Sequence, residues 1–291
     1  MRILTVPNWS FGRGASLLTA FADALAAAGV TVHYSASDLD HNRTVTAFSG
    51  EEAAVETALF ALCDLAFPIL EMGSHQGVHP RIGALDVCPI VPLEETPAAY
   101  REALAIAERF GSRLASSYGI PVFLYEKSER GRHEADLPTL RRGGFESVRD
   151  RELKPDFGPT RAHPRLGVTV LGVREFLIAF NVDLATENLA IARDIAREIR
   201  VYRADGDPRF LGVRALGFSL ASRRLTQVSI NLTLPDLTSV DPVVDWVETR
   251  AAELGVLVAS TELIGVIRDR DVRKATEIAI DARQIIRVNV A

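Results

Sequence analysis

The chain has 291 residues, of which 47% are hydrophobic and 24% are charged, and its formal net charge is −5. A chain of this length and composition can form two ordinary domains with sizeable buried cores, which excludes a largely disordered protein. The acidic balance and the lack of a basic tail or lysine-rich run exclude the usual electrostatic signature of nucleic-acid binding. The two cysteines, Cys63 and Cys88, are too few for a disulfide framework, so redox chemistry is not indicated.

Membrane association is not expected either. No uninterrupted apolar run approaches the roughly 20 residues of a membrane-spanning helix. The first ten residues, MRILTVPNWS, predict a strand and a turn and lack the apolar stretch of a signal peptide. We therefore expect a cytoplasmic protein that binds neither membranes nor nucleic acids.

The first half of the chain predicts a β-α-β-β-α-β order followed by one helix and one strand. Its helical segments are amphipathic or alanine-rich, Gly29 marks a helix end, and acidic residues open the second helix. In chain order, the predicted elements are 2–6, 15–29, 30–35, 43–49, 51–67, 84–93, 98–117 and 121–126.

The second half repeats this plan and adds a helix. Two copies of a split βαβ plan predict an α/β (α+β) protein with two ferredoxin-like βαββαβ subdomains and helices on their outer faces. We place the boundary near Leu171, which gives subdomains 1–171 and 172–291. The predicted elements of the second half are a strand at 167–184, a helix at 186–200, strands at 213–222 and 225–234, a helix at 239–255, a strand at 256–265 and a final helix at about 270–285.

Residues 126–167, between the two halves, are polar and rich in glycine, proline and charge. An irregular stretch of this length predicts a lid, a binding segment or a linker. Its last five residues, HPRLG, echo the run HPRIG at 79–83.

The stretch GSHQGVHPRIGALDVCPIVP concentrates histidine, arginine, glycine and proline before an apolar strand. His75 and His79 have the spacing of a zinc-hydrolase helix, but Gly77 and Pro80 disfavour a helix there. A glutamine also replaces the glutamate that would act as general base. We therefore expect no metal, and a metal-dependent hydrolase using His75 and His79 stays as the weaker alternative. In another interpretation, His75 only satisfies backbone groups in a turn.

The run VPNWSFGRGAS leads from a strand ending at Asn8 through Gly12 and Gly14 into a helix. Backbone N–H groups at such a helix start suit an anion, and an ordinary helix cap explains the pattern equally well. The sequence contains no P-loop and no G-x-G-x-x-G fingerprint, which disfavours a nucleotide cofactor.

A second polar cluster precedes the strand predicted at 43–49. Its residues can contribute to a binding site, or they can form a solvated hairpin turn. They are Asp38, Asp40, His41, Asn42 and Arg43.

Together these runs resemble the formiminotransferase domain, which in animals is joined to a cyclodeaminase. The resemblance implies two α/β subdomains that flank a groove holding tetrahydrofolate, and it implies a homodimer. We expect a stand-alone transferase, since no cyclodeaminase half follows. The matching runs, in family order over nearly the whole chain, are VPNWSFGRG, NRTVTAFSG, SHQGVHPRIGALDVCPIVP, PVFLYE, PDFGP, REFLIAFNVDL and QVSINL.

The resemblance implies transfer of a formimino group from N-formiminoglutamate to tetrahydrofolate, a reaction of histidine degradation and one-carbon metabolism. It assigns His79 as the general acid/base, a role that suits the unperturbed histidine pKa of about 6.5. The expected substrate-binding residues are Arg81, Arg43, Asn42, Asn8, Asp38 and Asp40. The segment implied to contact folate is Gly158, Pro159, Thr160, Arg161, Ala162, His163, Pro164, Arg165, Leu166 and Gly167.

The sequence departs from the family pattern at two acidic positions. Phe11 stands where the family has an acid in its first loop, and Ala36 aligns with an acid before the NRT run. Asp38 and Asp40 are the candidate replacements. These departures leave a non-catalytic folate-binding paralogue open as an alternative.

Overall fold

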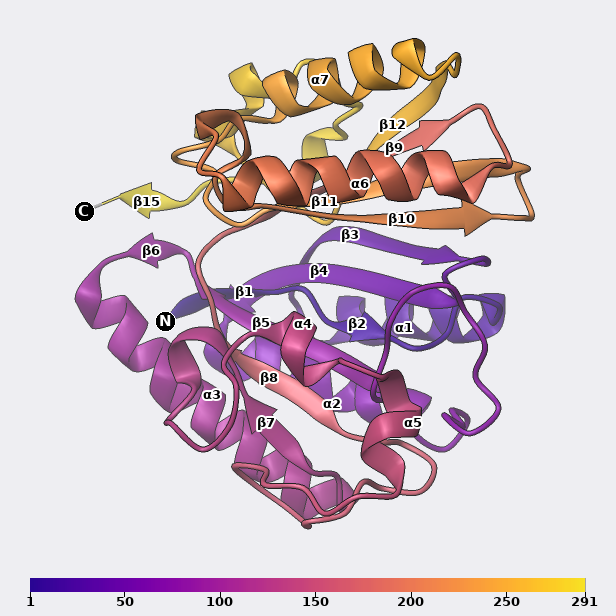
Figure 1. Ribbon diagram of the computed structural model, residues 1–291. Helices are drawn as coiled ribbons and strands as arrows, with labels where there is room; N and C mark the ends of the chain where they lie inside the picture. Colours follow the sequence, from indigo (N-terminus) through magenta and orange to yellow (C-terminus); the bar gives the residue numbers. More distant parts are fainter. Residues whose placement is uncertain (291) are drawn as a thin grey trace. The chain divides into compact units, whose positions relative to one another are not determined.

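The computed structural model describes residues 1–290, which fall into two units (Figure 1). The first unit contains Met1–Arg174 and the end of the chain from Val288, and the second is Glu175–Arg287. Both units combine strands with helices, so the predicted mixed α/β class is confirmed. No helix among residues 1–290 is both long and apolar enough to cross a membrane.

A seven-stranded sheet forms the centre of the first unit. Its strands are β1 (Arg2–Thr5), β2 (Asn8–Trp9), β3 (Thr31–Asp38), β4 (Arg43–Glu51), β5 (Leu85–Pro92), β7 (Val122–Leu124) and β8 (Thr169–Val173). Strand β3 lies at one edge and pairs with β4, while β1 and β2 both lie between β4 and β5. Strand β8 then runs parallel between β5 and β7.

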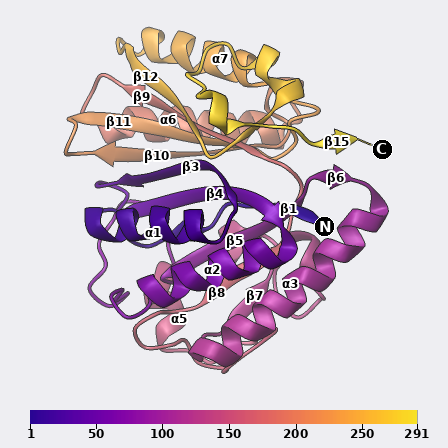
Figure 2. The same ribbon diagram turned by 180° about the vertical axis from the view of Figure 1, so that it is seen from behind.

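Helices cover one face of this sheet, as the view from behind shows (Figure 2): α1 (Ala15–Ala27), α2 (Glu52–Ala66) and α3 (Pro97–Tyr118). The ends of α3 follow from its sequence. At its start the Thr96 hydroxyl accepts a hydrogen bond from the Ala99 N–H, and at its end Gly119 adopts a left-handed conformation with φ 64°.

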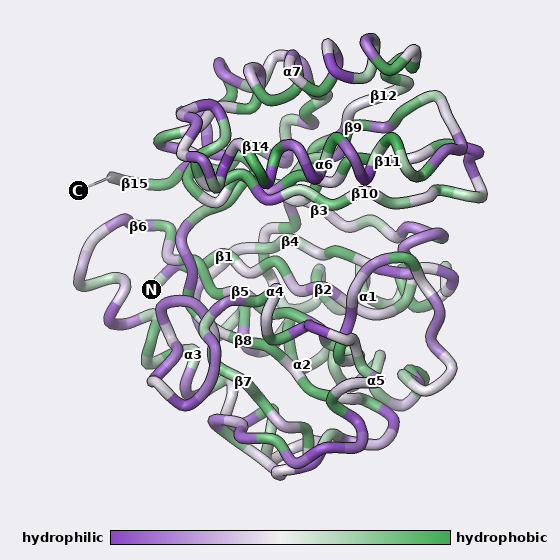
Figure 3. Tube along the Cα trace, viewed as in Figure 1, coloured by the Kyte–Doolittle hydropathy of each residue, from purple (hydrophilic) through white to green (hydrophobic). Residues whose placement is uncertain are grey.

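The core of the first unit lies between this sheet and its helices. Strands β5 and β8 are buried along their whole length, and the chain there is largely hydrophobic (Figure 3). Because strands buried on both faces tolerate few polar side chains, a charged residue inside β5 needs a specific partner.

The second unit has a four-stranded antiparallel sheet in the order β10-β11-β9-β12. Helices follow its first and third strands along the chain. The elements are β9 (Ile178–Leu184), α6 (Leu189–Ala204), β10 (Val213–Leu220), β11 (Leu225–Leu232), α7 (Val240–Glu253) and β12 (Val258–Ile264).

Short elements complete the described chain. Strand β6 (Glu94–Glu95) pairs in parallel with β15 (Asn289–Val290), and β13 (Ile267–Arg268) pairs in parallel with β14 (Ile285–Ile286). The short helices are η1 (Glu126–Ser128), α4 (Leu137–Leu140), α5 (Gly144–Arg149), η2 (Pro208–Phe210), η3 (Asp269–Lys274) and η4 (Ala282–Gln284).

Two element predictions are wrong. The run at 167–184, predicted as one strand, forms β8 in the first sheet and β9 in the second, because the chain leaves one sheet and enters the other between them. The helix predicted at 270–285 is replaced by the short turns η3 and η4. Buried Arg268 pairs with Asp271 within the first turn, and Asp281 starts a separate capping box at the second.

Candidate active site

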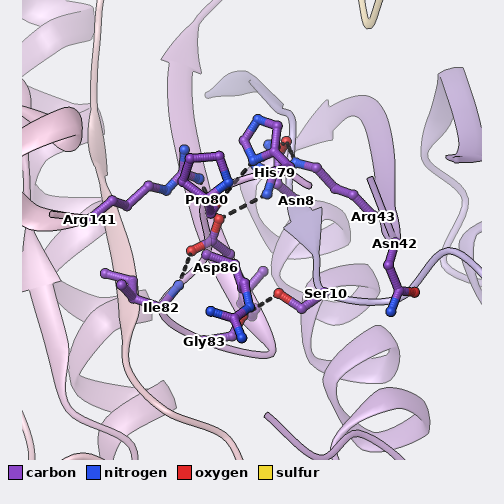
Figure 4. A network of polar contacts seen from close by, with 12 residues as sticks. Asn8, Ser10, Asn42, Arg43, His79, Pro80, Ile82, Gly83, Asp86 and Arg141 are labelled. Atoms are coloured by element: carbon purple, nitrogen blue, oxygen red, sulfur yellow. Dashed lines mark hydrogen bonds and ion pairs between the residues drawn. The ribbon is translucent and has the colours of Figure 1, made fainter. Parts of the chain in front are cut away.

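A buried carboxylate, Asp86, organises a polar cluster next to residues 73–83, which carry His75 and His79 and are called the histidine loop below (Figure 4). Its side chain lies on β5 and has no exposed surface. One oxygen, Oδ1, accepts a hydrogen bond of 2.9 Å from the Ile82 N–H, which fixes the loop that precedes the strand. The other oxygen, Oδ2, accepts from Arg43 Nη1 at 2.9 Å and from Arg141 Nη2 at 2.5 Å. One carboxylate therefore receives two guanidinium groups.

Arg43 starts β4 and reaches Asp86 across the sheet. Its Nε and Nη2 both donate to Asn8 Oδ1, at 3.0 and 2.8 Å. Burial and the neighbouring Arg141 lower the pKa of Arg43 to about 10, against the opposing effect of Asp86. Arg43 stays cationic at neutral pH, and Asn8 positions it.

His79 is partly buried beside these two arginines (Figure 4). Its Nδ1 lies 2.8 Å from the Pro80 carbonyl oxygen, and its ring centroid lies 5.6 Å from that of His41. Burial, followed by the charges of Arg43 and Arg141, holds the pKa of His79 well below the usual histidine value. The ring is therefore neutral near pH 7. Because a carbonyl oxygen accepts, Nδ1 carries the proton and Nε2 carries the lone pair.

Arg81 is committed to other partners. Its Nη1 and Nη2 donate to the two carboxylate oxygens of Glu146 at 2.9 and 2.8 Å, and the pair lowers the pKa of Glu146 to about 2. Its Nε donates to His75 Nδ1 at 3.1 Å. Arg81 thus links the histidine loop to α5. A substrate carboxylate would have to displace Glu146 to bind the Arg81 guanidinium.

His75 has both ring nitrogens engaged. Its Nε2 donates to the Asn42 carbonyl oxygen at 2.9 Å, and its Nδ1 accepts from Arg81. A metal ligand needs a nitrogen lone pair, which His75 has already given to Arg81. These contacts favour the turn-stabilising interpretation of His75. No group of three or more His, Cys, Asp or Glu side chains within residues 1–290 is placed to hold a metal ion.

Asn42 links three loops. It adopts a positive φ of 47°, its Oδ1 accepts from the Gly12 N–H at 2.7 Å, and its Nδ2 donates to the Gln76 carbonyl oxygen at 2.9 Å. A Cβ atom on Gly77 would lie 2.2 Å from the His41 carbonyl oxygen, so glycine is needed where these loops meet. The glycine permits close packing of one loop on another.

Of the two acids proposed from sequence, Asp38 ends β3 and Asp40 lies in the turn that follows it. Asp38 Oδ1 accepts from the His41 N–H at 2.7 Å, and the Asp40 carbonyl oxygen accepts from the Val78 N–H at 3.0 Å. These contacts stabilise the turn that precedes Arg43.

The segment implied to contact folate meets the histidine loop through backbone pairing. Gly167 forms an antiparallel bridge with Gly83, and the Ala84 N–H donates to the Leu166 carbonyl oxygen at 2.9 Å. The sequence echo between HPRIG and HPRLG therefore corresponds to two turns that pair at their glycines. A Cβ atom on Gly83 would lie 1.8 Å from the Val168 carbonyl oxygen.

Most of residues 158–165 is exposed. Within the turn, His163 Nδ1 accepts from the Leu166 N–H at 3.0 Å, and the Arg165 side chain donates to the Pro68 carbonyl oxygen at 2.9 Å. The segment thus has a fixed base and an accessible outer face.

Sequence reasoning missed Asp86 and Arg141. Asp86 had a usable signal, since it is the one charged residue within the otherwise apolar run ALDVCPIVP. Arg141 had none, because it lies among many charged residues of the segment 126–167.

Comparison with known proteins decides the family. The formiminotransferase domain, N-terminal subdomain, matches residues 2–174, and the formiminotransferase domain matches residues 179–289. The chain belongs to the formiminotransferase family. A glutamate formimidoyltransferase of Streptococcus pyogenes serotype M1 is 35% identical over 265 residues, covering 89% of this chain and 87% of the relative. One from Thermoplasma acidophilum is 35% identical over 272 residues, covering 91% and 88%.

A longer relative shows the same similarity over part of its length. The formimidoyltransferase-cyclodeaminase of Sus scrofa is 37% identical over 271 residues, which cover 90% of this chain and 49% of the pig protein.

Proposed function

We propose that this protein is a glutamate formimidoyltransferase that moves a formimino group between N-formiminoglutamate and tetrahydrofolate, with His79 as general acid/base. The observation that carries the proposal is the neutral His79 imidazole held beside Arg43, Asp86 and Arg141 in a formiminotransferase-family chain. The activity in the names of the relatives supports the same reaction.

The reaction requires one proton to be taken up and returned. N5 of tetrahydrofolate forms a bond to the formimino carbon and loses its proton, and the bond from that carbon to the glutamate nitrogen then breaks. The products are 5-formiminotetrahydrofolate and glutamate. In this proposal, Nε2 of His79 accepts the proton from N5 and donates it to the departing glutamate nitrogen. The lowered pKa supports the accepting step, because the ring is unprotonated when the reaction begins.

Substrate binding is assigned to the cationic cluster and the turns around it. Arg43 and Asn8 present a fixed positive charge next to His79, which suits a substrate carboxylate. Asn42, Asp38 and Asp40 support that surface by holding its turns. We assign tetrahydrofolate to the exposed face of residues 158–167, whose base pairs with the histidine loop. Holding both reactants beside one histidine supplies the proximity part of the rate.

Three finer expectations also stand as proposals: a homodimer, a cytoplasmic location and a role in histidine degradation. The family membership supports them. Sedimentation equilibrium tests the first, fractionation of the source cells the second, and growth on histidine after gene deletion the third.

A folate-binding protein without turnover is the second candidate. The observation that favours it is Phe11, which is buried and packs edge-to-face on Phe21 with ring centroids 5.3 Å apart. The position where the family has an acid is therefore part of the core.

One experiment separates the two functions. Formation of 5-formiminotetrahydrofolate from N-formiminoglutamate and tetrahydrofolate is measured spectrophotometrically, together with tetrahydrofolate binding by fluorescence. Turnover supports the transferase, and folate binding without turnover supports the second candidate.

A further inference from the structure

The cluster below His79 contains more positive charge than its own carboxylate balances. Arg43 and Arg141 have side chains only 10% and 11% exposed, and Asp86 is the carboxylate that accepts from both. Asn8, the other partner of Arg43, is neutral. Two guanidinium groups and one carboxylate leave one net positive charge in a largely desolvated place. Buried charge is costly unless it is paired, so the cluster favours binding of an anion.

Arg141 also has a donor left over. Its Nη2 donates to Asp86, while its Nε is buried and has no hydrogen-bond partner among residues 1–290. A buried N–H that lacks an acceptor carries a free-energy cost, which a bound oxygen atom would remove. An oxygen of a bound carboxylate would accept a charge-assisted hydrogen bond from this Nε–H.

The chain brings Arg141 to this place through two small helices. Arg141 directly follows α4, whose start is capped by Asp136 accepting from the Thr139 N–H at 3.1 Å. The Arg81–Glu146 pair holds the neighbouring α5 against the histidine loop. The helices on both sides of Arg141, α4 and α5, are therefore held in place, and this positions the Arg141 guanidinium.

We propose that Arg141, together with Arg43, forms a carboxylate subsite beside His79 and that this subsite binds the amino-acid donor of the transfer reaction. The assignment rests on the proposed function for the identity of the donor. Arg141 is the residue that gives the site its preference for an anionic donor.

The subsite also couples binding to chemistry. The groups that act on His79 are Arg43, Arg141 and His41, which lower its pKa, and the Pro80 carbonyl oxygen, which raises it. A bound carboxylate offsets part of the arginine charge, so the pKa of His79 rises when the donor binds. The histidine becomes a stronger base only when the donor is in place.

The test compares Arg141→Met with Arg142→Met. Arg142 is the adjacent, exposed arginine, so its replacement removes the same charge from the same segment without touching the cluster. Glutarate is the binding probe and uncharged glutaramide is its control, both measured by calorimetry. We expect Arg141→Met to weaken glutarate binding by about 10- to 100-fold, as loss of a charge-assisted contact does, and Arg142→Met to leave it unchanged.

Kinetics then identify which carboxylate occupies the subsite. Tetrahydrofolate also carries carboxylates, so the KM for N-formiminoglutamate and the Kd for tetrahydrofolate are measured for both variants. A raised donor KM with an unchanged folate Kd supports the proposal. An unchanged donor KM with a raised folate Kd would overturn the assignment of the subsite to the donor.

A measurement on the unmodified protein keeps the proposal testable if Arg141→Met does not fold. The His79 ring is titrated by NMR with and without saturating glutarate, and Arg141→Lys serves as the conservative variant. The pKa of His79 should rise with glutarate, and less so in the lysine variant. An unchanged His79 titration, together with equal glutarate affinity in Arg141→Lys and the unmodified protein, would overturn the proposal. Glutarate binding that depends on Arg141 in a protein without formimino transfer would instead keep the subsite and remove the proposed function.

Discussion

At the scale of single residues, the site depends on how charge is distributed around one carboxylate. Asp86 is fully buried and accepts from Ile82, Arg43 and Arg141. Burial and the charges of the same two arginines lower the pKa of His79 and keep its ring neutral. Asp86 therefore fixes the loop through Ile82, while Arg43 and Arg141 act on the basicity of the histidine.

Asp86→Asn should destabilise the protein strongly, because it leaves two buried guanidinium groups without a countercharge. Loss of one partner from a buried ion pair costs about 3–5 kcal/mol. Urea unfolding measures the change. Glu187→Gln is the control, since Glu187 pairs with Arg224 on the surface and its loss should cost less than about 1 kcal/mol. Equal stability of Asp86→Asn and the native protein would contradict this role for Asp86.

The pH dependence of kcat/KM should follow His79. Because its pKa is lowered, the unprotonated form is present at neutral pH and is lost only as the pH falls well below 6.5. Steady-state rates between pH 4 and 8 measure the acid limb, and the same series for Arg142→Met is the control. An acid limb centred at or above the ordinary histidine value would contradict the assignment.

At the scale of elements, the segment 126–167 is stabilised by His133, whose pKa is raised, whereas that of His79 is lowered. His133 Nε2 lies 2.8 Å from Asp156 Oδ2, and His133 Nδ1 lies 2.9 Å from the Glu134 carbonyl oxygen. Both partners are acceptors, so both ring nitrogens must carry a proton. Burial lowers the pKa of His133, but its hydrogen bonds to Asp156 and to the Glu134 carbonyl oxygen and the charges of Asp156 and Glu129 outweigh this effect, and the pKa is raised overall.

The stability of this segment should therefore decrease as the pH rises. A raised pKa means that the folded state binds the proton more tightly than the unfolded state does. The stabilisation is complete below about 6.5, the unfolded value, and is lost as the pH passes the raised folded value. Hydrogen exchange at pH 6 and 8, corrected for intrinsic rates, should show faster opening of residues 126–157 at pH 8. In His133→Gln this difference should disappear, and an unchanged difference would contradict the role of His133.

The turn at 158–167 should respond to folate. Its base is fixed by the Gly83–Gly167 bridge, whereas its outer face is exposed and able to move. A loop of this kind closes over its ligand, so hydrogen exchange at 158–165 should slow when tetrahydrofolate is added. Residues 31–38 in β3 provide an internal control. Unchanged exchange at saturating tetrahydrofolate would argue against this placement of the folate.

The elements also show how far the sequence could predict this site. Apolar periodicity indicated the strands that carry Arg43 and Asp86, and the glycine and proline positions indicated the turn at His79. The contacts between loops could not be predicted, because they depend on tertiary packing. One example is the ion pair of Arg81 with Glu146, 65 residues along the chain, which has no local sequence signal.

At the scale of the whole molecule, the sequence predicted a mixed α/β protein with a repeated plan. It could not predict which sheet each strand joins. The run at 167–184 is mostly apolar. Its charged pair Arg174–Glu175 lies in the connection between β8 and β9, but one charged pair does not by itself mark the end of a strand. The return of β15 to pair with β6 is also a long-range contact without a local signal.

In the proposed mechanism, His79 is held neutral by burial and by its arginine neighbours, and it moves the proton in formimino transfer. The most direct test is single-turnover formation of 5-formiminotetrahydrofolate by the native protein and by His79→Gln, with both substrates saturating and with tetrahydrofolate affinity measured in parallel. The rate constant should be lower by about 10²- to 10⁴-fold in His79→Gln, as loss of a general acid/base produces. Folate affinity should stay within a few fold. Equal rate constants for the two proteins would contradict the proton-transfer role of His79.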